Sequence, residues 1–147
     1  MTAAVHPIPP GLFCIPAALC ALTGEDLMSV IVPSLNRHGG GQGLVDTVAG
    51  TTMHAAVEVL EEIGFTVRSY KSSAEAGPLK ARISTWARRS QDRWPGRLLL
   101  VATSGHCLVI ADGCVYDTHS PMGESGETHP YARARATWAA LVTRRQK

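Results

Sequence analysis

The sequence has no apolar run approaching the ~20 residues that a membrane-spanning helix requires. Its four cysteines include no C-x-x-C pair, so reduced thiols are the expectation. No Lys or Arg precedes the apolar segment over residues 11–22, and no A-x-A-like site follows it, which argues against a secretory signal. A hydrophobic share of 45% excludes disorder of the whole chain. We therefore expect a cytoplasmic protein with no membrane association.

Positive charge is scarce in the first half. Residues 1–67 hold one Arg against six carboxylates, whereas residues 68–147 hold thirteen Lys or Arg against six. A basic half can indicate nucleic-acid binding. Here the charges are scattered and no binding motif accompanies them, so a solvated surface is the better interpretation and a nucleic-acid partner is not expected.

One domain over residues 1–147 is expected, because neither a repeat nor a linker divides the chain. It would begin with an extended, proline-rich arm over residues 1–11. A capping pattern at Thr23 and Asp26 starts a short helix that Pro33 would stop. Helical periodicity and breakers predict helices over residues 14–22, 25–31 and 53–63, and a further one that includes Leu79, Ile83 and Trp86.

Strand patterns follow the helices. They cover residues 65–70 and 97–103, and Asp112-Gly113 joins two β-rich runs, which is a strong hairpin signal. The segment after Tyr131 could be a strand or a helix. This separation of helices from strands predicts an α+β fold, with helices packed on a largely antiparallel sheet.

The predicted hairpin register brings two functional side chains to one face. Counting outward from Asp112-Gly113 pairs His106 with His119 and Leu108 with Asp117, so His106 and Asp117 become diagonal neighbours. A carboxylate placed there could orient the imidazole. His119 could be a rival third member or a metal partner, although no known ligand spacing supports a metal site.

Cys14 is the expected nucleophile. It stands at a predicted helix N-terminus, where the helix dipole and unpaired N–H groups stabilise a thiolate. Cys107 and Cys114 fall on the hairpin face opposite His106, and Cys20 lies deeper in the helix. The remaining histidines are expected at the surface; they are His6, His38, His54 and His129.

A family resemblance rests on these motifs. Cys14-Ile15-Pro16-Ala17-Ala18-Leu19 with Thr23-Gly24, and Ser104-Gly105-His106 with Asp112-Gly113 and Tyr116-Asp117, resemble the motifs of bacteriocin-processing and related papain-like cysteine peptidases. Thr51-Thr52 and Gly64-Phe65 are similar to short peptidase-like proteins carried by bacteriophages. The resemblance spans most of residues 12–119 and implies a papain-like fold with Cys14, His106 and Asp117 as catalytic residues.

The sequence departs from that family at one position. Papain-like enzymes usually carry an oxyanion-binding Gln about six positions before the nucleophile, where this chain has Ile8. Gln42, in a glycine-rich loop, could substitute, or the backbone N–H of Cys14 could act alone.

Two functions therefore stay open at this stage. The first is a cysteine hydrolase that cleaves a peptide, isopeptide or other amide bond in a peptide or protein substrate. The second is an inactive papain-like binding or structural module, such as a phage virion component or an inhibitor of a host protein. Neither requires a cofactor, and a phage-encoded protein would act in the host cytoplasm or the virion.

Overall fold

The computed structural model describes residues 5–12, 14–38, 53–70 and 80–145. Helices dominate the first half of the chain and strands the second. The helical elements are α1 (Cys14–Thr23), the π-helical turn η1 (Leu27–Ile31), α2 (Val32–Arg37), α3 (Met53–Ile63) and α4 (Ile83–Asp92). The strands are β1 (Phe65–Tyr70), β2 (Leu98–Thr103), β3 (His106–Ala111), β4 (Cys114–Tyr116), β5 (Glu124–Ser125) and β6 (Trp138–Arg144).

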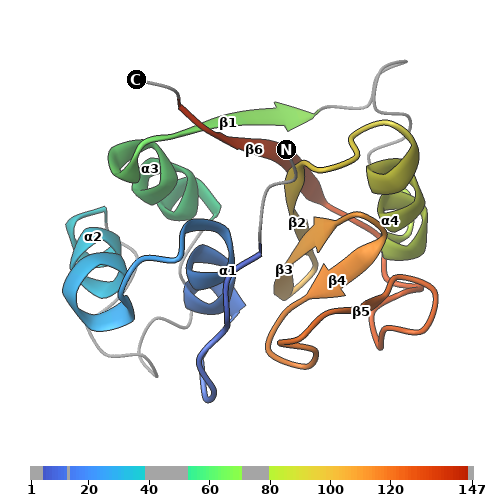
Figure 1. The fold of residues 1–147 in the computed structure, drawn as a ribbon, viewed down its shortest axis with the longest axis horizontal. Coiled ribbons are helices and arrows are strands. Elements are labelled where there is room, and N and C mark those ends of the chain that lie inside the picture. The colour runs from blue at the N-terminus through green and yellow to red at the C-terminus, as the bar shows by residue number, and fades with distance from the viewer. Residues whose placement is uncertain (1–4, 13, 39–52, 71–79, 146–147) are drawn as a thin grey trace.

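The strands form one antiparallel sheet in the order β1-β6-β2-β3-β4-β5. The segment that the sequence left open is thus a strand, and β6 pairs with β1 on one side and with β2 on the other. The sheet lies between two helical layers, with α1, α2 and α3 on one side and α4 on the other (Figure 1). The predicted α+β class is confirmed.

Each face of the sheet has its own core. Alternate residues of β3 point to opposite faces, as the strand period requires. Val109 and Ala111 pack with α1 and α3, whereas Leu108 and Ile110 pack with Ile83 and Trp86 of α4. Residues 15–23 of α1 are all buried, Ala17 and Leu19 completely, so this helix has no solvent-exposed polar face.

The hairpin prediction is right near its turn and wrong further out. Asp112 and Gly113 both have positive φ, as a two-residue turn of this kind requires, and Ala111 pairs with Cys114. Pairing ends at Val109↔Tyr116, so the expected pairs of His106 with His119 and of Leu108 with Asp117 do not form. The chain instead turns after Tyr116, where Asp117 and Ser120 exchange backbone hydrogen bonds.

Two predictions at the second helix are also corrected. Its cap is Asp26, whose carboxylate accepts from the Ser29 N–H at 2.9 Å, rather than Thr23. Pro33 does not stop the helix, because it occupies the first turn of α2, where a missing N–H breaks no intrahelical hydrogen bond.

The N-terminal segment, predicted as an extended arm, has neither helix nor strand over residues 5–12. It is nevertheless anchored, because Ile8 and Leu12 are buried in the core beside α1. Within the described ranges, no single helix is long and apolar enough to cross a membrane, and α1 joined to the helical stretch Leu27–Arg37 reaches that length only as a pair bent by 109°.

Core packing makes a first prediction. Leu100 lies in the middle of β2 with 0% of its surface exposed, so Leu100→Ala should lower the free energy of unfolding by about 2–5 kcal/mol, measured by urea denaturation. Met122→Ala is the matched control, because Met122 is 90% exposed and its truncation should change stability by less than about 0.5 kcal/mol. Equal effects of the two substitutions would contradict this description of the core.

Candidate active site

Cys14 is the first residue of α1 and lines a small cavity. Its side chain is partly exposed and its thiol is free. The first-turn N–H groups of a helix have no intrahelical partners, so they favour negative charge at this position. The cavity measures about 270 Å³ and is lined by Cys14, Ile15, Met53, Ala102, Thr103, Gly105, His106 and Cys107.

His106 and Asp117 meet beside this thiol. His106 is the first residue of β3, at the end of the sheet that the start of α1 reaches. Its Nε2 lies 2.8 Å from Oδ2 of Asp117, and both side chains are buried. The ring also lies close enough to the Cys14 sulfur for the two to shift each other's pKa, and both side chains line the same cavity. The structure thus brings together the three residues singled out from the sequence, and a hydrogen bond joins His106 to Asp117.

The Asp117 carboxylate is saturated with N–H donors. Oδ1 accepts from the backbone N–H of His119 at 3.0 Å and of Ser120 at 2.9 Å. Nε2 of His129 lies 3.1 Å from each carboxylate oxygen. Burial opposes the charged form of Asp117, but the bonds from His106 and His129 outweigh it and lower the pKa to about 2.

These contacts polarise the thiol and the imidazole. The neighbouring Cys107 thiol, together with the imidazole and positive charge of His106, lowers the pKa of Cys14 to about 4 against the effect of burial. Burial acts against a charged His106, yet its bonds to Asp117 and Cys14 raise its pKa to about 9. A thiolate–imidazolium pair is therefore the favoured state between about pH 4 and pH 9.

Cys107 has a part that the sequence did not reveal. It does face away from Leu108 and Ile110, as the alternation predicts, but that is the face on which α1 packs. Its buried thiol lines the same cavity as Cys14, and the neighbouring Cys14 sulfur together with burial raises the pKa of Cys107 well above its usual value. Cys107 is therefore a poor nucleophile.

The prediction of a surface position for His129 is wrong. Its side chain is fully buried against Asp117, twelve residues away along the chain. No local pattern marks it, because it stands in a segment of Gly, Pro and polar residues that resembles an exposed loop. Tyr131 was also missed, and its ring stacks on His106 with centroids 4.3 Å apart.

His119 does not take the role of a rival third member. Its backbone N–H bonds Asp117, while its ring lies 5.6 Å from that of His106, centroid to centroid. In the described part of the chain, no group of three or more His, Cys, Asp or Glu side chains is arranged to hold a metal ion. Gln42, the predicted oxyanion donor, lies outside the described residues.

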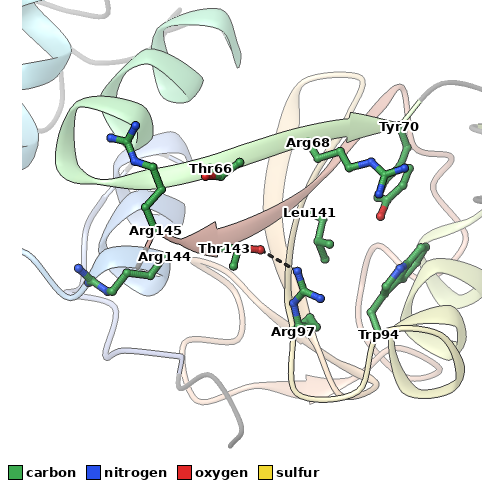
Figure 2. A pocket seen from close by; sticks show the side chains of 9 residues that line it. All are labelled: Thr66, Arg68, Tyr70, Trp94, Arg97, Leu141, Thr143, Arg144 and Arg145. Carbon is green, nitrogen blue, oxygen red and sulfur yellow. Dashed lines mark hydrogen bonds between the residues drawn. The ribbon is translucent and has the colours of Figure 1, made fainter. Parts of the chain in front are cut away.

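Of the other hollows among the described residues, two differ in how they relate to the Cys14 cavity. One of about 340 Å³ shares Met53 with the Cys14 cavity and is otherwise lined by His54, Val57, Val67, Ser69 and Trp138. The larger one, about 650 Å³, lies over β1 and β6, away from Cys14, and shares no lining residue with its cavity (Figure 2). There Arg97 is turned toward Thr143, whose hydroxyl it bonds at 2.8 Å (Figure 2). This hollow of about 650 Å³ is thus separate from the Cys14 cavity.

No family model and no curated protein matches the chain. Among solved structures, the chain is similar to the peptidase domain of Streptococcus ComA, a bi-functional ABC transporter involved in a quorum sensing pathway. The two are 16% identical with a TM-score of 0.52, and the match covers 97% of this chain and 99% of that domain. The fold is therefore that of a papain-like cysteine peptidase domain, with N-terminal helices packed on an antiparallel sheet.

Proposed function

We propose that the protein is a cysteine hydrolase that cleaves a peptide, isopeptide or other amide bond, with Cys14, His106 and Asp117 as its catalytic triad. The observation that carries the proposal is that Cys14 and His106 line one cavity while His106 is hydrogen-bonded to the buried Asp117 carboxylate. This arrangement lowers the pKa of the Cys14 thiol and favours the thiolate.

The proposed reaction begins with attack of the Cys14 thiolate on the carbonyl carbon of the substrate. The developing oxyanion would be stabilised by the Cys14 backbone N–H at the start of α1. His106 then gives its proton to the departing amine nitrogen, the C–N bond breaks, and a thioester to Cys14 remains. Neutral His106 next takes a proton from water, whose oxygen attacks the thioester, releasing the acid and restoring the Cys14–His106 pair.

The alternative of an inactive papain-like module keeps one supporting observation. Ile8, which stands where the family carries its oxyanion Gln, is an apolar side chain buried in the core, so it supplies no donor. Such a module would keep a reactive Cys14 without turnover. A bacteriophage origin, a virion or host-cytoplasm location, and a peptide or protein partner stay predictions.

Thiol labelling tests the proposed nucleophile. Because the pKa of Cys14 is about 4, iodoacetamide should modify Cys14 rapidly at pH 6, with a rate that falls only below about pH 5. His106→Ala removes the imidazole and its positive charge beside the thiol, so the transition should move to higher pH and the rate at pH 6 should fall. Mass spectrometry of the labelled peptides is the measurement.

Cys114→Ala is the control for this labelling, because Cys114 is half-buried on β4 and does not line the Cys14 cavity. The rate at Cys14 should be unchanged in that variant. Slow modification of Cys14 and Cys114 at similar rates would contradict the proposed site.

The pH dependence of hydrolysis follows from the same two groups. Deprotonation of Cys14 should activate the enzyme as pH rises through about 4, and loss of the His106 proton should inactivate it as pH rises through about 9. On a panel of peptide and peptidoglycan amides, kcat/KM should therefore form a broad plateau between these limits. Turnover that survives in Cys14→Ala would contradict the mechanism, and labelling without turnover on any substrate would favour the inactive module.

Gln42 can be tested as the oxyanion donor. If its side chain donates to the oxyanion, Gln42→Ala should lower kcat by ~10²–10³-fold with little change in KM, measured by steady-state kinetics. Gln91→Ala is the matched control, because the Gln91 amide lies near Asp112 at the opposite end of the β3–β4 hairpin from His106. Unchanged kcat in Gln42→Ala would leave the Cys14 N–H as the donor.

A further inference from the structure

A second histidine, His129, contacts the Asp117 carboxylate, and it has no role in the proposed reaction. None of the His129 side chain is exposed, and its Nε2 lies 3.1 Å from both oxygens of Asp117. Backbone bonds hold the residue on both sides, since His129 N–H donates to the Ser125 carbonyl and Ala132 N–H donates to the His129 carbonyl. His129 is thus fixed in place by the turn that follows β5.

The other ring nitrogen of His129 settles which tautomer is present. Nδ1 lies 3.0 Å from the backbone nitrogen of Tyr131, which carries a hydrogen and can only donate. Nδ1 is therefore the acceptor and bears no proton, so the ring proton sits on Nε2. His129 accordingly presents an N–H to Asp117, as a carboxylate requires.

The next residues extend this arrangement to His106. The Tyr131 ring stacks on the His106 imidazole at an interplanar angle of 24° and a centroid distance of 4.3 Å. One tripeptide, His129-Pro130-Tyr131, therefore touches the carboxylate through a side chain and the imidazole through an aromatic face. We call it the clamp segment.

We propose that His129 is a positioning residue of this site: its Nε2–H fixes the Asp117 carboxylate so that Oδ2 faces His106, while Tyr131 holds the plane of the His106 ring. The inference rests on the proposed function of Cys14 and His106. Its physical basis is that outer-shell hydrogen bonds fix the orientation of the groups they contact and tune their basicity. The backbone donors of His119 and Ser120 reach Oδ1 alone, so His129 is the donor that contacts both oxygens.

Two substitutions distinguish the loss of the His129 N–H donor from the loss of the side chain's volume. His129→Leu fills the space without an N–H, whereas His129→Gln keeps an N–H near the position of Nε2. We expect kcat/KM to fall by ~10–100-fold in His129→Leu through kcat, with KM nearly constant, and to recover to within about threefold in His129→Gln. His38→Leu is the matched control, because this partly buried histidine bonds Glu58 and Glu62 between α2 and α3. Its kcat/KM should stay within about twofold of wild type.

A readout that does not depend on turnover keeps the two proposals apart. In ¹⁵N-labelled wild-type protein, NMR at pH 7 should show His129 with its proton on Nε2. The pKa of His106, about 9 in the intact site, should fall in His129→Leu, because a less well-held carboxylate stabilises the imidazolium less. These NMR signatures without any hydrolysis would support the positioning role while the proposed function failed.

The inference is overturned by any of three results. The first is a proton on Nδ1 of His129 in the wild-type protein. The second is an unchanged His106 pKa and unchanged kcat in a folded His129→Leu variant. The third is a His129→Gln variant as impaired as His129→Leu. If His129→Leu does not fold, the wild-type tautomer and the His129→Gln kinetics still decide the question.

Discussion

The organisation of this site depends on one buried negative charge, the carboxylate of Asp117. With 1% of its side chain exposed, Asp117 has lost its hydration, and an unpaired charge in such a place costs several kcal/mol. Hydrogen bonds to a charged group contribute ~1.5–3 kcal/mol each, so the donors around it offset that cost. Two of these donors are backbone N–H groups of the turn after β4, and two are histidine rings. The Asp117 carboxylate therefore holds together three segments, which are the turn after β4, the segment after β5 and the start of β3.

The Asp117 carboxylate also affects the position of the Cys14 thiol, through His106. Asp117 holds Nε2 of His106, which leaves the other nitrogen for Cys14 across the end of the sheet. Cys14 belongs to the helical layer and His106 to the sheet, so the pair exists only because α1 packs against β3 through an apolar face. The same packing places the Cys107 thiol next to the Cys14 sulfur. The apolar contact between α1 and β3 therefore also positions the side chains of the candidate site.

Local patterns predicted much of this arrangement. The Asp112-Gly113 turn, the helix over residues 53–63 and the apolar strand before Ser104 depend on near neighbours, and each was confirmed. His106 and Asp117 were paired correctly by residue but through the wrong register. Their contact needs only that a buried carboxylate reach an imidazole, and the tight turn at Asp117 and Ser120 achieves this without a continued strand.

The features that the sequence did not predict share a physical reason: each depends on contacts between residues far apart in the chain. His129 is buried because the turn after β5 folds back onto Asp117, and no neighbouring residue signals that return. The alanines at the start of β6 have little strand preference of their own, and two flanking strands decide the conformation. Cys107 was assigned to the correct face, but only the packing of α1 shows that Cys14 lies on the same side.

The position of β6 has a consequence for synthesis of the protein. This strand, residues 138–144, comes last among the described elements, yet it lies inside the sheet and provides the only pairing between β1 and the other described strands. Such non-local pairing is slow to form, and here it must wait until the ribosome has released nearly all of these residues. Cys14 and His106 are therefore synthesised before the strand that completes the sheet beside them, so their final arrangement depends on a segment that is made later.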